Sequence, residues 1–259
     1  MRVPSWSCAI GTAALVAGCD LAPSVAADGP HVVSVTPALG AGPLDRDVTL
    51  RIELDRRIAP NSLADGVVEI TSGGNYVWLV QNIDVVEPAL VVRPRDPLDP
   101  DVTYGMRVHV LHDLEGHASI ATQPTTFHTS DVISGARAEA PTFADVEEVL
   151  TACTGCHAGS TAPLGLDLSS GAAVRATAIG VPAIEERSTV DGYLDMPVTA
   201  ALTGLPRIAP GEPARSYLLY VILDDPHIAG AAMPPTGALL SLDAITLVQR
   251  WIAAGAPTD

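Results

Sequence analysis

The sequence predicts a chain of two domains, an all-β sandwich followed by a mainly α-helical domain. Its 259 residues are enough for two ordinary domains. Apolar and polar residues alternate with period two between about residues 31 and 129, as half-buried strands require. After residue 130 this alternation ends, and apolar residues recur at helical spacing.

Composition bounds the class of function. All 14 basic side chains are Arg, and 30 acidic side chains give a formal charge of -16. This balance disfavours nucleic-acid binding, and a hydrophobic content of 47% argues against intrinsic disorder. An acidic surface can steer a basic redox partner, but it also keeps an exported protein soluble. We therefore expect no nucleic-acid partner and assign no redox partner from charge.

The first 18 residues predict a signal peptide, because Arg2 precedes an apolar stretch at residues 9–17 that is too short to span a bilayer. The stretch LVAGC at residues 15–19 resembles the lipobox of bacterial lipoproteins. This resemblance implies diacylation of Cys19 and a lipid anchor in the cell envelope, on the periplasmic or outer face of a membrane. Ordinary secretion with cleavage after Ala27 is the alternative, and Asp20 does not decide between the two membranes.

The β domain is predicted over residues 30–131. Val48, Leu50, Ile52 and Leu54 should face one way, and Tyr104, Met106, Val108 and Val110 form a second such set. With the shorter apolar runs, seven strands are predicted, at residues 32–35, 48–54, 67–70, 76–80, 90–92, 104–111 and 125–129. Seven short strands separated by turns are typical of a β-sandwich.

Three stretches of this domain resemble landmarks of bacterial Ig-like domains of the SbsA type: VSVTP at residues 33–37, LVVRP at 90–94 and DLEG at 113–116. His117 departs from the Asn that is common after the Gly in that family. Such domains are usually spacers or surface-display units, and the fold alone implies no ligand.

Four histidines stand in or beside the later strands, at His109, His112, His117 and His128. Their spacing matches no compact zinc pattern, so we expect solvent-exposed or turn histidines and no metal site.

A small, polar linker is predicted at residues 132–141, followed by a second domain at 142–259. Thr142 is a suitable N-cap for a helix with Phe143, Val146, Leu150 and Cys153 on its apolar face. The chain then reaches Cys153-Thr154-Gly155-Cys156-His157.

This pentad is the attachment pattern of a c-type haem. Two thiols add to the porphyrin vinyl groups, and the adjacent imidazole reaches the iron from one face. A zinc site would need two further ligands, and no other nearby Cys pair supplies them. We therefore expect one covalent haem c at Cys153 and Cys156, with His157 as an iron ligand.

The second axial ligand is predicted to be Met233, because the prolines that follow it hold an extended loop from which a thioether can be presented. Met196 and His227 are rivals, and an open iron position is a further possibility.

A last helix is predicted to begin after Ser241 and to end at Gly255 and Pro257, with Leu242, Ile245, Val248 and Ile252 as its apolar stripe. The stretches RWIAAGAP at 250–257 and PGEPARSYLL at 210–219 resemble bacterial cytochrome c domains of the kind common in planctomycete and myxobacterial proteins. The resemblance spans 142–259 and implies that the first and last helices cross beside the haem, where Leu150 and Trp251 help to exclude water. Trp251 as ordinary core is the alternative, and residues 158–207 are left unassigned.

The predicted function is single-electron transfer by a membrane-anchored monohaem cytochrome, more a carrier than an enzyme. One alternative is an electron-entry or docking subunit of a separate redox enzyme. Another is a haem enzyme or gas sensor with an open iron position, although a dihaem peroxidase would need a second C-x-x-C-H pattern.

Overall fold

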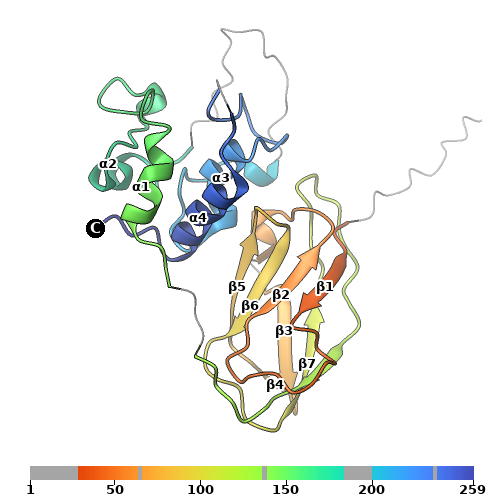
Figure 1. Cartoon of the computed structure of the whole chain (residues 1–259). Helices are drawn as coiled ribbons and strands as arrows, with labels where there is room; N and C mark the ends of the chain where they lie inside the picture. Colours follow the sequence, from red (N-terminus) through yellow and green to blue (C-terminus); the bar gives the residue numbers. More distant parts are fainter. Residues whose placement is uncertain (1–28, 64–65, 136–138, 184–199, 236–237) are drawn as a thin grey trace, which may run out of the picture.

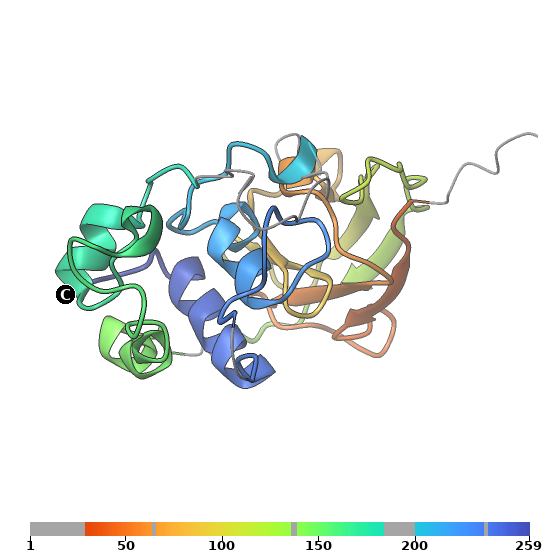
Figure 2. The same cartoon turned by 90° about the horizontal axis from the view of Figure 1, so that it is seen from above.

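The computed structural model describes residues 29–63, 66–135, 139–183, 200–235 and 238–259. It has a β-sandwich, which we call the Ig-like module (residues 29–135), and a helical module (residues 139–259). The two lie side by side, and α3 and α4 stand between the sandwich and the pair α1 and α2 (Figure 1, Figure 2).

Two four-stranded antiparallel sheets form the sandwich. One has the order β1 (Val32–Thr36), β2 (Leu50–Leu54), β6 (Ala89–Pro94), β5 (Leu79–Asp84). The other has the order β4 (Asn75–Tyr76), β3 (Val68–Ser72), β7 (Thr103–Val108), β8 (Thr125–His128). Alternate side chains of both sheets fill the core, as the period-two pattern predicts; they include Leu50, Ile52, Ile70, Leu90, Met106 and Phe127.

The strand predicted at residues 76–80 is wrong as a single element. The structure divides it, because β4 pairs with β3 in one sheet, whereas β5 pairs with β6 in the other. The chain therefore changes sheets between Tyr76 and Leu79, and Trp78 on this crossing is 80% exposed. An apolar run gives no signal of such a change, since both halves are equally apolar.

The prediction for the end of β7 is also wrong. Val110 is exposed, whereas Leu111 is buried. The strand ends at Val108, so the period of two no longer fixes which side chains face the core beyond it.

The helical module consists of α1 (Phe143–Thr151), α2 (Gly171–Thr177), α3 (Tyr217–Ile222) and α4 (Leu242–Ala253). Four short 3-10 helices are described in the chain, at Pro60–Leu63, Pro163–Gly165, Ala200–Leu202 and Pro213–Arg215. The predicted helix starts are confirmed. The Asp145 carboxylate accepts from the N–H and hydroxyl of Thr142, and the Ser241 hydroxyl accepts from the N–H of Ala244.

Leu242 is not part of the buried stripe of α4, because it is the first residue of the helix and is 63% exposed. Ile245, Val248 and Ile252 are buried as predicted, and Trp251 is fully buried beside them. Gly255 has a φ of +100°, a left-handed conformation that ends the helix at its predicted place.

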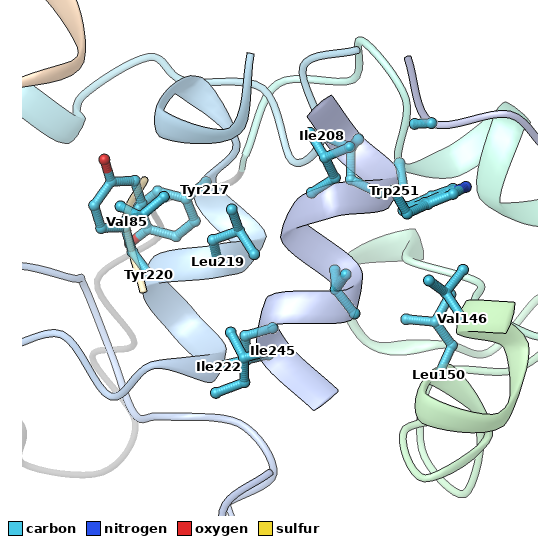
Figure 3. Close-up of a cluster of buried hydrophobic side chains, with 14 of the residues drawn as sticks. Val85, Val146, Leu150, Ile208, Tyr217, Leu219, Tyr220, Ile222, Ile245 and Trp251 are labelled. Carbon is cyan, nitrogen blue, oxygen red and sulfur yellow. The ribbon is translucent and has the colours of Figure 1, made fainter. Parts of the chain in front are cut away.

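The helical core forms where α1 packs against α4. Val146 and Leu150 of α1 point toward the α4 face that carries Trp251, and the rings of Phe143 and Trp251 lie 6.3 Å apart (Figure 3). On the other side of α4, Leu219, Tyr220 and Ile222 of α3 complete the cluster; all of these side chains are buried.

The two modules share their boundary. Val85, Val86 and Leu114 of the Ig-like module belong to the helical core, and Figure 3 shows Val85 beside the tyrosines of α3. Gln249 of α4 accepts from the N–H groups of Val85 and Val86 at 2.7 and 3.2 Å. The sandwich is therefore packed onto the helices rather than joined to them by a linker alone.

None of the helices among the described residues is long and apolar enough to cross a bilayer. The predicted leader, Cys19 and Met196 lie outside the described residues, as do residues 136–138 of the predicted linker.

Candidate functional site

The Cys153–His157 turn directly continues α1. The N–H groups of Cys156 and His157 both donate to the Cys153 carbonyl, at 3.2 and 2.9 Å. These bonds hold the two cysteines and the histidine in one compact turn. Neither thiol is in a disulfide. Cys153 is half-buried against the helical core, which raises the pKa of its thiol, whereas Cys156 is exposed.

His157 is held by the segment that follows the turn. Its Nδ1 lies 3.2 Å from the backbone carbonyl oxygen of Leu166, an acceptor only, so the proton sits on Nδ1. The His157 carbonyl accepts from the N–H of Leu168 at 2.9 Å. Among the described residues none hydrogen-bonds Nε2, so this nitrogen keeps a lone pair available for a metal.

A buried cation supports the same segment. The Arg207 guanidinium donates to the carbonyls of Thr177 and Leu164, and within the described ranges no carboxylate pairs with it. Burial lowers the pKa of Arg207. Leu164 has a φ of +53°, a strained conformation for a residue with a side chain, and the bond from Arg207 helps to fix it.

Met233 is half-buried in the loop that follows α3. Its N–H donates to the carbonyl of Val221, in the last turn of α3, at 3.1 Å. This loop and the turn that follows α1 both lie at the upper end of the helical module in Figure 1. The two predicted iron ligands therefore come from separate loops at one end of a shared core.

His227 is poorly placed to be an iron ligand. Its Nδ1 lies 2.7 Å from an Asp225 carboxylate oxygen, and its Nε2 lies 2.8 Å from a Glu115 carboxylate oxygen of the Ig-like module. Both ring nitrogens are thus engaged at the boundary between the modules. Of the two rivals to Met233, His227 is disfavoured by these contacts.

Three of the four predicted histidines have separate acidic partners. His109 contacts Glu69, His117 contacts Asp113, and His128 contacts Asp101. Within the described part of the chain, the one group with metal-ligand spacing is Asp113, Glu115 and His117. No group gathers the four predicted histidines.

The donor set at the Cys153–His157 turn fits a c-type haem. It offers two unpaired thiols and an imidazole whose free nitrogen is Nε2, because the backbone holds the other nitrogen. The Met233 thioether lies in the loop after α3, and the α1–α4 core covers one side of the turn. Two thiols and an adjacent imidazole are the groups that haem c attachment uses, and burial on one side tunes the potential of the iron.

Comparison with known proteins bears on the N-terminal region. The model of the family described as "Bacterial Ig-like domain" matches residues 26–129. The N-terminal region is a bacterial Ig-like domain. This agrees with the sandwich and with the resemblance of its strand landmarks.

Solved structures also resemble part of the chain. The N-terminal part of the bacterial S-layer protein SbsC is 17% identical with a TM-score of 0.32, over 40% of this chain and 24% of that one. PcoC, a methionine-rich copper resistance protein from Escherichia coli, is 17% identical with a TM-score of 0.32, over 39% of this chain and 99% of that one. The chain thus spans about a quarter of the S-layer fragment that it matches. No curated protein matches the chain.

Three features of the site were not predicted from the sequence. The Leu166 carbonyl gave no signal, because any residue supplies a backbone oxygen. Arg207 stands in the apolar stretch LPRIAP at residues 205–210, and an isolated Arg there is a signal of a buried cation. The contact of His227 with Glu115 joins residues 112 positions apart, and no local pattern encodes it.

Proposed function

We propose that this protein is a monohaem c-type cytochrome that carries single electrons in the bacterial cell envelope. Cys153 and Cys156 would hold one haem covalently, and His157 and Met233 would be the ligands of its iron. The hydrogen bond from His157 Nδ1 to Leu166 carries the proposal, because it leaves Nε2 as the free nitrogen of a histidine that shares one turn with two free thiols.

The haem, when bound, supplies reversible one-electron chemistry at its iron. The chain's own residues bind and shield it. Leu166 fixes the orientation of the His157 ring, and Val221 anchors the backbone of Met233. Leu150, at the end of α1, lies in the core next to the turn and would exclude water from that side, whereas Trp251 packs on Phe143 at the start of α1. No bond-making side chain is required, so the protein acts as a carrier rather than an enzyme.

The Ig-like module and the predicted lipid on Cys19 support a place in the cell envelope. The lipid would hold the chain at a membrane, and the Ig-like domain follows it directly in sequence. Because the sandwich is packed onto the helices, it would hold the haem at a set distance and orientation from the Ig-like domain. The redox partner is a protein that the chain does not identify.

The test of this proposal is haem attachment. Full-length protein, exported in a host with c-type maturation machinery, should keep a haem stain after denaturing electrophoresis. Cys153→Ala and Cys156→Ala should each weaken it, and the double variant should abolish it. Thr154→Ala, in the same turn, keeps both thiols and should stain like the wild type. An unstained wild-type band at normal expression would refute the proposal.

A further inference from the structure

An imidazole lies between two carboxylates of different modules. His227 Nδ1 is 2.7 Å from Asp225 in the helical module, and its Nε2 is 2.8 Å from Glu115 in the Ig-like module. The exposed fractions of the side chains are 19% for His227, 0% for Asp225 and 49% for Glu115. The ring is thus clamped between a buried acid and an exposed one.

Both nitrogens of the ring face acceptors. An ionised carboxylate only accepts hydrogen bonds, so each contact needs a proton on the ring nitrogen. Only the imidazolium ion has two N–H donors, whereas the neutral ring has one donor and one acceptor. The observed pair of contacts therefore requires protonated His227.

The charged groups around the ring come from both modules. Arg57, after β2, pairs with Asp225 at 2.8 Å, and Arg56 lies 3.7 Å from Asp113. A cavity of about 570 Å³ connects these groups, and its charged and titratable lining comprises Asp55, Arg56, Arg57, Asp113, Glu115, His117, Asp225 and His227. Burial alone would lower the pKa of His227, but the hydrogen bonds to Asp225 and Glu115 outweigh burial and raise it.

We propose that His227 is a proton-dependent latch between the two modules, closed when the ring is protonated and released when it loses a proton. Asp225 keeps the remaining N–H, because it is fully buried and also accepts from Arg57 and from the His227 backbone at 2.9 Å. Once the ring has lost its proton, the Glu115 carboxylate faces a lone pair of the ring and is repelled. Because Glu115 is half exposed, its side chain then turns to solvent. The bond that breaks is the His227–Glu115 contact, which is one of several contacts between the modules.

The direction of the pH dependence follows from the raised pKa. The stabilisation from the His227–Glu115 contact is complete below pH 6.5, the ordinary pKa of histidine. It is lost as pH rises through the higher pKa that His227 has in the folded protein. In the cell envelope the latch would respond to external pH. This inference does not depend on the haem, since it uses only contacts between protein side chains.

The test is an NMR titration of the full-length protein that follows the His227 ring and the backbone amides of residues 113–117. We expect His227 to titrate above 6.5, and the amide shifts to change in the same step. Glu115→Gln, an exposed substitution that leaves the fold intact, should lower the His227 pKa and remove the step from the amides. His109→Gln removes the His109–Glu69 pair, whose two residues belong to the Ig-like module. It should leave the His227 pKa and the amide step unchanged.

Two results would overturn the latch. One is a His227 pKa at or below 6.5 in the wild type. The other is an amide step that persists in Glu115→Gln, or that disappears in His109→Gln. Haem-free and haem-loaded protein should behave alike here, which separates a failed latch from a failed haem assignment.

Discussion

At the scale of single residues, the partner of a polar atom decides what its side chain can do. His157 and His227 both lie in loops of the helical module. One ring nitrogen of His157 meets a backbone carbonyl and the other stays available, whereas both nitrogens of His227 meet carboxylates. The sequence predicted His157 as a ligand, because its place after two cysteines is a local pattern. It does not decide whether His227 is a ligand, because the partner Glu115 is distant in the chain.

Met233 carries the first prediction at this scale. Met233→Ala removes the thioether and should leave an open iron position, so the reduced variant should bind carbon monoxide rapidly and stoichiometrically, whereas the wild type should bind it slowly. The absorption spectrum after flash photolysis or stopped-flow mixing measures the rate and the amount of carbon monoxide bound. Met106→Leu, which replaces a buried Met of the sandwich, is the matched control and should behave as the wild type. Rapid binding by the wild type would instead favour a sensor or enzyme.

At the scale of elements, the helix ends and the apolar faces could be predicted, but the sheet change could not. Thr142 and Ser241 begin α1 and α4 as expected, because capping is decided within one turn of chain. The division of residues 76–80 between two sheets depends on which distant strands pair with each half. Such pairing is a tertiary property, and an apolar run of five residues does not contain it.

The contact between α1 and α4 carries the prediction at this scale. Leu150 is buried between these helices, so Leu150→Ala should lower the free energy of unfolding of the helical module by about 2–5 kcal/mol. Urea denaturation followed by helical circular dichroism measures it. Leu242→Ala, on the exposed first residue of α4, should change the same quantity by less than about 0.5 kcal/mol. Equal effects of the two substitutions would contradict the packing of α1 on α4.

At the scale of the whole molecule, the modules are joined by shared core and by polar contacts. Val85, Val86 and Leu114 enter the helical core, and Ala214 of the helical module enters the core of the sandwich. The sequence predicted two domains and a linker, and periodicity is informative about each domain separately. It carries no information about their boundary, because buried side chains there follow neither module's period.

Gln249 carries the prediction for this boundary. Its side chain is 6% exposed, accepts from two N–H groups of the Ig-like module and donates to Asp84 at 2.7 Å. Gln249→Ala removes the acceptor of the buried Val85 N–H, whereas Val86 and Asp84 keep a bond to each other. The substitution should cost about 1–3 kcal/mol and separate the unfolding of the two modules. Calorimetry measures both effects. Gln123→Ala, in an exposed loop, should change neither the stability nor the number of transitions. A wild-type-like transition in Gln249→Ala would show that Gln249 does not couple the two modules.

The covalent bond between chain and haem is the claim on which the electron-carrier function depends. Trypsin should release one peptide from residue 138 to Arg175, since Arg137 precedes it and no basic residue interrupts it. Mass spectrometry of this peptide, from protein exported with its maturation machinery, should find it heavier by one haem, with neither thiol open to alkylation. A peptide at its amino-acid mass that takes up two alkyl groups would contradict the account.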